Sequence, residues 1–325
     1  MNRRRFASGI AALAGAIALA AGAQQRGRSY RVAALFGVGG SAMQHYRAAL
    51  AERLAKHGLI EGRNLAIDAR GATEIFHEDR DQARELLAAG PDAILTCLTR
   101  VTQATAAATQ TVPIVFVWVE NPVASGLVKA YARPGGNVTG VTNRFGELLV
   151  KRLELAHELV PGLERVAVIG FRFGLYAENA GPLREAAGRL GVGLLELRIR
   201  TGWAEAVETA VAKGAQAVLP FHLHALLPIA GAELIRVALE KRVAVVYGDA
   251  DAVRAGGLIS YGTDLAEDVR RGADLLAKVL RGAEPATLPV DQAARFEMVV
   301  NLKTARALGL AVPQAVLIRA DRVIE

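Results

Sequence analysis

The sequence is poor in cysteine and in aromatic residues. One cysteine, Cys97, occurs in 325 residues, which excludes an internal disulfide even in an oxidising compartment. Aromatic residues make up 5% and hydrophobic residues 52%, a balance typical of a globular protein whose helices pack closely on sheets. Lys and Arg outnumber Asp and Glu by 39 to 32, but they are scattered along the chain. We therefore expect no nucleic-acid partner.

Common catalytic motifs are also missing. The chain contains no Gly-x-Ser-x-Gly, no P-loop and no His-Glu-x-x-His. Cys97 has no evident base and is interpreted as a small buried thiol. His222 and His224 are spaced to share one face of a strand, but no third metal ligand is in register. We therefore expect His222 to line a polar pocket wall or to lie in a partly exposed loop. These absences favour binding over catalysis, with no cofactor and no metal.

The N-terminal residues have the pattern of a targeting segment. A cationic stretch ending at Phe6 precedes a weakly apolar run to Ala20, and Ala21-Gly22-Ala23 is a small-x-small cleavage site. Residues 1–23 are therefore predicted to be a cleaved signal peptide, and the mature protein is expected in the periplasm. Arg-Arg-x-Phe also resembles a twin-arginine signal, and a general secretory signal stays open.

The remaining chain is long enough for two domains and alternates apolar runs with amphipathic helices. The alternation runs from Tyr30 to Val141 and restarts after Gly146. Continuous apolar strands separated by helices predict two Rossmann-like α/β lobes with parallel sheets covered on both faces. Ligands of such folds bind at the carboxyl ends of the strands, so the loops that follow the strands hold the candidate site residues.

The first such loop, Gly37–Ala42, fits Gly-x-Gly-x-x-Ala between a strand and a helix, with Asp68 at the end of the next strand. This pattern resembles a dinucleotide-binding motif. The alternative is a small-residue loop, including Gly40 and Ser41, that lets a ligand carboxylate approach a helix N-terminus. We favour the second interpretation, because the motif is short and glycine is common in this chain.

Two further loops of the first lobe carry candidate contacts. Thr96, Leu98 and Thr99 end a strand just before a helix, where hydroxyls and free backbone N–H groups suit a carboxylate. Trp118 belongs either to the core or to a platform on which a ligand stacks. Asn121 either hydrogen-bonds a ligand or caps the following helix, which is the more frequent role of an Asn before Pro.

The second lobe has its own candidates. Phe171 and Tyr176 either line a pocket or pack on the lobe surface. Asp249 ends a strand, and its carboxylate either pairs with a ligand ammonium group or caps the next helix. An ammonium partner here would complement a carboxylate held by the first lobe, which is the charge pattern of an amino acid.

The stretch Gly256–Leu310 is the best-formed part of the sequence and predicts strand, helix, connector, strand and helix. Asp264 and Asn301 are expected to cap its two helices. The segments GGLISYGTDLAEDV, LPVDQAARFEMVVNLKTARALGL, ARPGGNVTGVT and KRLELAHELVPGLERVAVI resemble the tryptophan/tyrosine-type periplasmic substrate-binding proteins of ABC transporters. The chain departs from the family pattern at Ala294, where a proline is expected, and in the loop from Phe171.

The resemblance implies the class I periplasmic-binding-protein-like fold, with two lobes joined by a multi-strand hinge. Residues 29–142 plus 256–286 would form lobe I, and residues 143–255 plus 287–325 would form lobe II. The implied function is that of a monomeric, non-enzymatic solute-binding protein of an ABC importer. It would capture an amino acid or related carboxylate between its lobes and deliver it to a membrane permease. The alternatives are an exported NAD(P)-binding oxidoreductase using Gly37–Ala42 and a periplasmic ligand sensor for a membrane receptor.

Overall fold

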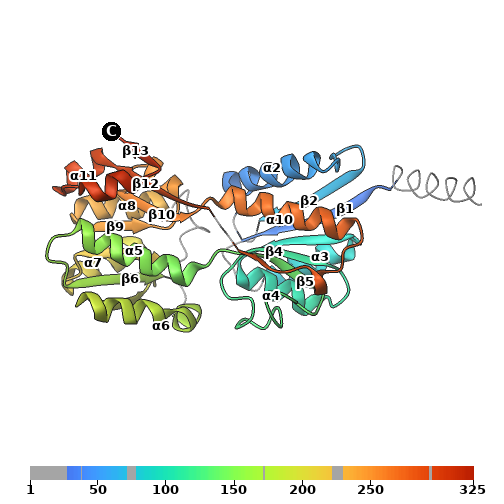
Figure 1. Cartoon of the computed structure of the whole chain (residues 1–325), viewed down its shortest axis with the longest axis horizontal. Coiled ribbons are helices and arrows are strands. Elements are labelled where there is room, and N and C mark those ends of the chain that lie inside the picture. The colour runs from blue at the N-terminus through green and yellow to red at the C-terminus, as the bar shows by residue number, and fades with distance from the viewer. Residues whose placement is uncertain (1–27, 38, 72–77, 171–172, 222–229, 293–294) are drawn as a thin grey trace, which may run out of the picture.

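The computed structural model describes residues 28–325 except 38, 72–77, 171–172, 222–229 and 293–294. The elements gather around two separate sheets, which we call lobe I and lobe II (Figure 1). The predicted signal peptide, Phe171 and His222 lie outside the described residues. Within the described part of the chain, no helix is both long and apolar enough to cross a membrane.

The sheet of lobe I has the strand order β11-β5-β4-β3-β1-β2, and its neighbouring strands pair in parallel. Its strands are β1 (Tyr30–Phe36), β2 (Leu65–Gly71), β3 (Ala93–Cys97), β4 (Ile114–Val119), β5 (Val138–Thr142) and β11 (Asp291–Gln292). Its helices are α2 (Gly40–Lys56), α3 (Glu78–Ala88), α4 (Thr99–Ala108), α10 (Leu265–Leu280) and the short 3-10 helix η1 (Pro285–Thr287).

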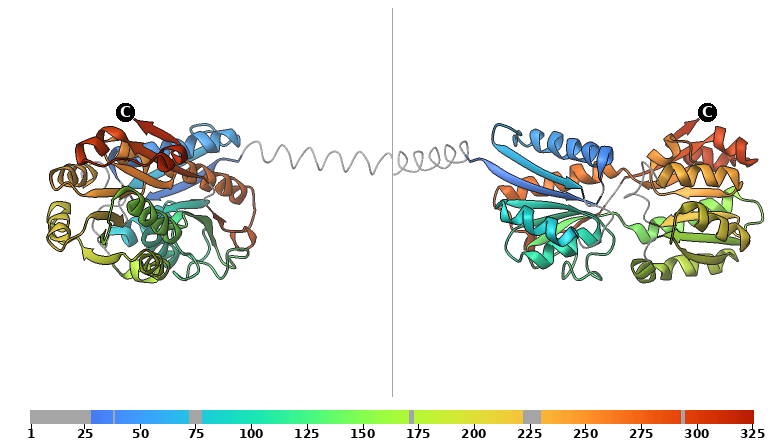
Figure 2. Two further views of the ribbon diagram at one scale, coloured as in Figure 1. Left: turned by 60° about the vertical axis from the view of Figure 1, so that its left-hand side comes forward. Right: turned by 180° about the vertical axis from the view of Figure 1, so that it is seen from behind.

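The alternation of side chains along β1 explains how helices cover both faces of this sheet. Val32 and Phe36 pack in a cluster with residues of α2 and α10, whereas Leu35 packs with residues of α3 and α4. Both faces of the sheet are therefore buried, as Figure 2 shows from behind, and β3 and β4 are buried along their whole length. This burial accounts for their uninterrupted apolar sequences.

The sheet of lobe II has the order β13-β12-β10-β9-β8-β6-β7, and all its pairs are parallel except β10 with β12. Its strands are β6 (Arg165–Gly170), β7 (Gly193–Arg198), β8 (Ala217–Phe221), β9 (Ala244–Tyr247), β10 (Ile259–Thr263), β12 (Phe296–Asn301) and β13 (Arg322–Ile324). Its helices are α5 (Phe145–Leu159), α6 (Phe173–Leu190), α7 (Trp203–Ala212), α8 (Ala230–Glu240), α9 (Ala250–Arg254), α11 (Leu302–Leu308) and α12 (Gln314–Arg319).

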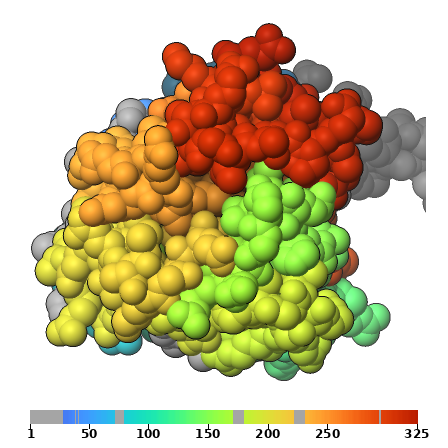
Figure 3. All heavy atoms as spheres, turned by 90° about the vertical axis from the view of Figure 1, so that its left-hand side faces the viewer, coloured from blue at the N-terminus to red at the C-terminus, as the bar shows by residue number. Residues whose placement is uncertain are grey.

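The predicted fold class, two α/β lobes with mostly parallel sheets, is confirmed by these two sheets. The predicted helix caps are also confirmed. The side chain of Asp264 accepts a hydrogen bond from the Glu267 N–H at 3.0 Å, and that of Asn301 accepts one from the Thr304 N–H at 3.0 Å. In Figure 3 the C-terminal segment and the segment that contains α5 lie side by side on the end face of lobe II.

The chain passes between the lobes three times, and two of these passages differ from the prediction. The strand expected around Leu258–Gly262 was assigned to lobe I, but β10 pairs with β9 and β12 in lobe II. The segment that follows residue 287 was assigned to lobe II, but β11 pairs with β5 in lobe I. The crossings therefore lie at residues 143–144, at Asp264, and between β11 and β12.

Residues 124–132, which lie between β4 and β5, do not form the helix that an Asn before Pro would begin. The structure has turns there instead. Gly126 adopts a left-handed φ of 72°, and the N–H groups of Leu127 and Val128 both donate to the Pro122 carbonyl. This hydrogen bonding closes a tight loop, and a helix cannot propagate through it.

Helix α10 fastens the last part of lobe I to the first. Arg53 of α2 forms two hydrogen bonds of 2.8 Å with Asp274, and Arg271 binds Asp291 of β11 at 2.6 and 3.1 Å. The helix approaches β4 so closely that a Cβ atom on Gly272 would lie 2.5 Å from Val117 Cγ1. Only glycine at this position lets α10 settle on the sheet.

Replacing Gly272 by alanine should therefore destabilise the protein by about 1–3 kcal/mol, because the added methyl overpacks the contact with Val117. Gly188 is the matched control, since it lies within α6 with nothing within 4 Å of the position of an added Cβ. Gly188→Ala should stabilise the protein by about 0.5–1 kcal/mol, the ordinary helix preference for alanine. Chemical unfolding measures both, and a shift of the same sign for the two variants would contradict the close contact.

The first turn of α10 contains a buried acid next to the second crossing. Asp268 is 3% exposed, accepts a hydrogen bond from the Thr263 side chain, and its Oδ2 has no hydrogen-bond partner among the described residues. Burial raises the pKa of Asp268 to about 7, although Thr263 and Arg271 act in the opposite direction. Because the folded state holds this proton more tightly than the unfolded state, stability is lost as the pH rises from about 4 to 7.

Asp268→Asn removes this loss. The effect of the substitution on the free energy of unfolding should therefore be more favourable at pH 8 than at pH 4, and the two effects should differ by about 4 kcal/mol. Urea unfolding at the two pH values measures the difference. Asp81→Asn, at an acid whose side chain is 71% exposed, is the control and should change stability by less than about 0.5 kcal/mol. An equal effect of Asp268→Asn at both pH values would refute the assignment.

Candidate functional site

The candidate residues of lobe I are brought together by the parallel register of three neighbouring strands. Leu35 of β1 pairs with Thr96 of β3, and Thr96 pairs with Phe116 of β4. The loops that follow these strands therefore leave the sheet at the same edge. Gly40, Leu98, Thr99 and Trp118 lie in or directly beside the segments at this edge, with Trp118 near the end of β4 and Gly40 and Thr99 at the starts of α2 and α4.

The glycines of the first loop have different roles. A Cβ atom on Gly37 would lie 2.2 Å from Leu98 Cδ1, so this glycine lets the loops after β1 and β3 touch. Gly40 has a φ of 58°, is exposed, and begins α2. Gly39, the N-cap residue of α2, has no side chain that could accept a hydrogen bond from the first N–H groups of the helix. The side chain of Ser41 lies outside the described residues. An uncapped N-terminus of a 17-residue helix suits an anion.

The threonines after β3 divide into a structural pair and a candidate contact. Thr96 is fully buried, and its Oγ1 lies 2.9 Å from Thr102 Oγ1, which itself donates to the Leu98 carbonyl at 2.9 Å. This chain of hydrogen bonds fixes Leu98 at its unusual φ of 75°. Thr99 is 5% exposed in the first turn of α4, where its hydroxyl lies next to that helix N-terminus.

Trp118 forms an aromatic pair with Tyr46 of α2. The ring centroids lie 4.8 Å apart with an interplanar angle of 73°, an edge-on arrangement. Trp118 has a φ of 59° and is 1% exposed, and its Nε1 is buried without a hydrogen-bond partner among the described residues. A buried, unpaired donor on a strained backbone is typical of a site that awaits a polar ligand group.

Asn121 accepts a hydrogen bond from the Ala124 N–H at 3.0 Å. Of the two roles expected for Asn121, it has the capping role, although the segment that it caps is a turn and not a helix. Tyr46 is a site candidate that the sequence reading missed, since its position marks only the buried face of α2. Burial raises the pKa of its hydroxyl, and the carboxylates of Asp249 and Asp251 raise it further.

The acids Asp249 and Asp251 of lobe II therefore act electrostatically on Tyr46 of lobe I. Asp249 is 4% exposed and caps α9, accepting the Ala252 N–H at 2.9 Å. Burial raises the pKa of Asp249 to about 6, opposed by the Ala252 hydrogen bond and the positive charge of Arg152. The capping role expected for Asp249 is thus present. Its charge also acts on Tyr46 of lobe I, and this effect is compatible with the capping role. We call Tyr46, Thr99, Trp118 and Asp249 the interlobe site.

The wall behind Asp249 is held by Arg152, a second residue that sequence reading missed. Arg152 is 1% exposed, donates from Nε to the Tyr261 carbonyl at 2.8 Å and from Nη2 to the Gly248 carbonyl at 3.5 Å, and lies 5.2 Å from the centroid of the Phe145 ring. Burial lowers its pKa to about 10, while Asp249 counteracts the shift. The available signal is an arginine between Leu149 and Leu153 on the apolar face of α5.

Two glycines make room for this arginine. A Cβ on Gly248 would lie 2.8 Å from Arg152 Nη2, and one on Gly262 would lie 1.8 Å from the Gly248 carbonyl oxygen. The ends of β9 and β10 therefore approach each other closely around the guanidinium. Arg152 belongs to α5, the helix that follows the first crossing. It joins this helix to β10, the strand before the second crossing, and to the loop that carries Asp249.

Three other predicted contacts lack a described environment. Phe171 and His222 fall outside the described residues, and Tyr176 belongs to α6 but its side chain is not described. Among the residues that are described, no group of three His, Cys, Asp or Glu side chains is arranged to hold a metal ion. Cys97 is buried and its thiol pKa is raised by desolvation, which agrees with its interpretation as a core residue.

The comparisons with known proteins now identify the class. Residues 31–324 match the family model described as ABC transporter substrate binding protein. The chain belongs to this family. A curated relative, the tyrosine-binding protein of Clostridioides difficile strain R20291, is 26% identical over 262 residues, which cover 79% of this chain and 74% of that protein.

Solved structures agree on the fold. A conserved domain protein from Vibrio cholerae superposes with a TM-score of 0.83 at 27% identity, covering 91% of this chain and 100% of that chain. A domain from Streptococcus pneumonia in complex with L-Trp has a TM-score of 0.82 at 22% identity, with the same coverage of 91% and 100%. The class I periplasmic-binding-protein-like architecture is thereby confirmed. Members of this family bind small molecules and work with ABC permeases.

Replacing Arg152 by methionine should destabilise the protein by about 3–5 kcal/mol, because the buried carbonyls of Tyr261 and Gly248 lose their donors and Asp249 loses its nearby positive charge. Equilibrium unfolding in urea measures the loss. Lys151→Met is the matched control, since the neighbouring Lys151 is 58% exposed in its side chain and pairs only with Glu154. The control should lose less than about 1 kcal/mol. Equal losses would show that Arg152 has no special structural role.

Proposed function

We propose that this protein is the extracytoplasmic solute receptor of an ABC importer and that it closes its two lobes around an aromatic amino acid or a related carboxylate. The proposal rests on one observation above the others. Lobe I offers an uncapped helix N-terminus, and lobe II offers the buried acid Asp249, whose charge acts on Tyr46 of lobe I. A ligand with a carboxylate and an ammonium group matches both.

The aromatic pair supports the choice of side chain. Tyr46 and Trp118 present ring edges and one unpaired indole N–H at the interlobe site. An aromatic ligand ring can pack against them, and a polar substituent on that ring can accept the indole hydrogen bond. The tyrosine-binding relative and the L-Trp complex of the structural neighbour are consistent with this ligand class.

Capture follows from the division of contacts between the lobes. A ligand that touches only one lobe has the same affinity for every lobe arrangement, whereas a ligand held by Thr99 and Asp249 favours arrangements that bring the two together. Delivery to a permease then requires that the lobes separate again. We further propose that the signal sequence of residues 1–23 directs export to the periplasm, and that the mature protein acts as a monomer.

The double variant Thr99→Val with Asp249→Asn should weaken binding of L-tyrosine and L-tryptophan at least tenfold, since a hydrogen bond and an ion pair are both lost. Asparagine keeps the cap of α9 but removes the negative charge near Arg152, so binding is measured at a temperature at which thermal unfolding shows each variant to be folded. In the parent protein, affinity should fall as the pH drops below about 6, because Asp249 becomes neutral. The single Asp249→Asn variant should lose this pH dependence. Calorimetric titration measures all of these effects.

Asp251→Asn is the matched control, because Asp251 is a neighbouring acid whose side chain is 61% exposed and pairs with Arg254. It should bind like the parent. Parental affinity in the double variant would reject the interlobe site. Saturable binding of NADPH would favour the oxidoreductase alternative. In lobe I, however, the space beside Gly37 is filled by Leu98, and the side chain of Asp68 lies 3.6 Å from Arg70.

A further inference from the structure

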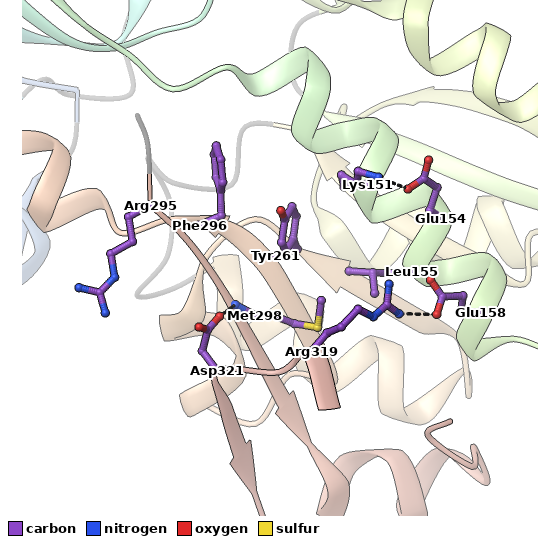
Figure 4. Close-up of a pocket in the computed structure, with 10 residues that line it drawn as sticks. All are labelled: Lys151, Glu154, Leu155, Glu158, Tyr261, Arg295, Phe296, Met298, Arg319 and Asp321. Atoms are coloured by element: carbon purple, nitrogen blue, oxygen red, sulfur yellow. Dashed lines mark hydrogen bonds and ion pairs between the residues drawn. The ribbon is translucent and has the colours of Figure 1, made fainter. Parts of the chain in front are cut away.

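Lobe II has a cavity of about 530 Å³ that shares no lining residue with the interlobe site. It lies between α5 on one side and β10, β12 and the C-terminal segment on the other (Figure 4). Its volume is within the range of small-molecule sites, roughly 300–1,000 Å³. Neither the family nor the proposed function gives this cavity a role.

Part of the cavity lining is flat and apolar. Tyr261 and Phe296 stack with ring centroids 6.0 Å apart and an interplanar angle of 29°. Both are half-buried, while Leu155 and Met298 beside them are almost fully buried. Because β10 and β12 are antiparallel, with Tyr261 opposite Met298 and Thr263 opposite Phe296, these side chains share one face of the sheet. The surface suits a planar aromatic ring.

The charged groups of the lining are not all neutralised. Each acid is engaged: Glu154 with Lys151 at 2.7 Å, Glu158 with Arg319, and Asp321 with the Met298 N–H at 2.8 Å. Figure 4 shows the Lys151–Glu154 and Arg319–Glu158 pairs as dashed lines.

Arg295 stands apart from these pairs. Within the part of the chain that is described, this exposed guanidinium has no ion pair or hydrogen bond. The lining thus holds three basic and three acidic side chains, and Arg295 is the one charged group among them that no described residue engages.

We propose that this cavity is a second binding site, which takes a planar aromatic carboxylate. The ring lies against Tyr261 and Phe296, and the carboxylate is bound by Arg295. An ammonium group is not required, because the acids of the lining are already engaged, and this distinguishes the ligand class from that of the interlobe site. The proposal does not depend on what the interlobe site binds.

Titration with indole-3-acetate tests the site, with indole-3-ethanol as the matched probe that lacks the carboxylate. We expect saturable binding of the acid, observed by calorimetry and by NMR chemical shifts, and at least tenfold weaker binding of the alcohol. Arg295→Gln should weaken binding of the acid at least tenfold, and Phe296→Leu should weaken it severalfold. Arg295 is on the surface, so its replacement leaves folding intact.

Two control variants locate the bound probe. Arg322→Gln removes an exposed charge from the same lobe outside the cavity, and Asp249→Asn changes the interlobe site. Both should bind indole-3-acetate within twofold of the parent. Loss of binding in Asp249→Asn with parental binding in Arg295→Gln would place the probe in the interlobe site and overturn the proposal. Equal binding of acid and alcohol, or no saturable binding, would also overturn it.

Discussion

The arrangement of lobe II depends on one buried cation. Arg152 is enclosed by the carbonyls of Gly248 and Tyr261 and by the Phe145 ring, and it lies close enough to Asp249 for each charge to stabilise the other. Burying one of these charges without the other would be costly. The pair therefore holds three segments of lobe II together as one unit. These are the loop that carries Asp249, helix α5 after the first crossing, and strand β10 before the second crossing. Any movement between the lobes must occur outside this unit.

The two sides of the interlobe site are built by different physical means. Lobe I uses backbone dipoles at a helix N-terminus, close contacts permitted by Gly37, and an edge-on aromatic pair, none of which changes charge with pH. Lobe II uses an ionisable acid whose pKa is raised towards the physiological range. Under the proposed function, the affinity for a zwitterionic ligand would thus respond to acidity through lobe II only.

The sequence predicts the layers of this fold well and the placement of individual strands less well. Continuous apolar runs such as Ile114–Val119 identify buried parallel strands, and Asp264 and Asn301 identify helix starts. The strand β10 was assigned to the wrong sheet, because an apolar run is compatible with either sheet and only pairing decides. Tyr46 and Arg152 were missed as site residues because their roles come from contacts with distant segments. Asn121 and Thr96 were found, but their hydrogen bonds are local.

The position of α10 in the chain has a consequence for folding. This helix covers one face of the lobe I sheet, yet it follows β6 to β9 of lobe II in the sequence. Until it is synthesised, Leu50 and Val117 lack part of the cover that buries them in the native protein. Lobe I is therefore completed only when α10 packs on a sheet from which it is separated by most of lobe II in the sequence. Such non-local contacts slow folding. The order of synthesis, more than local propensity, decides when the first lobe becomes a complete unit.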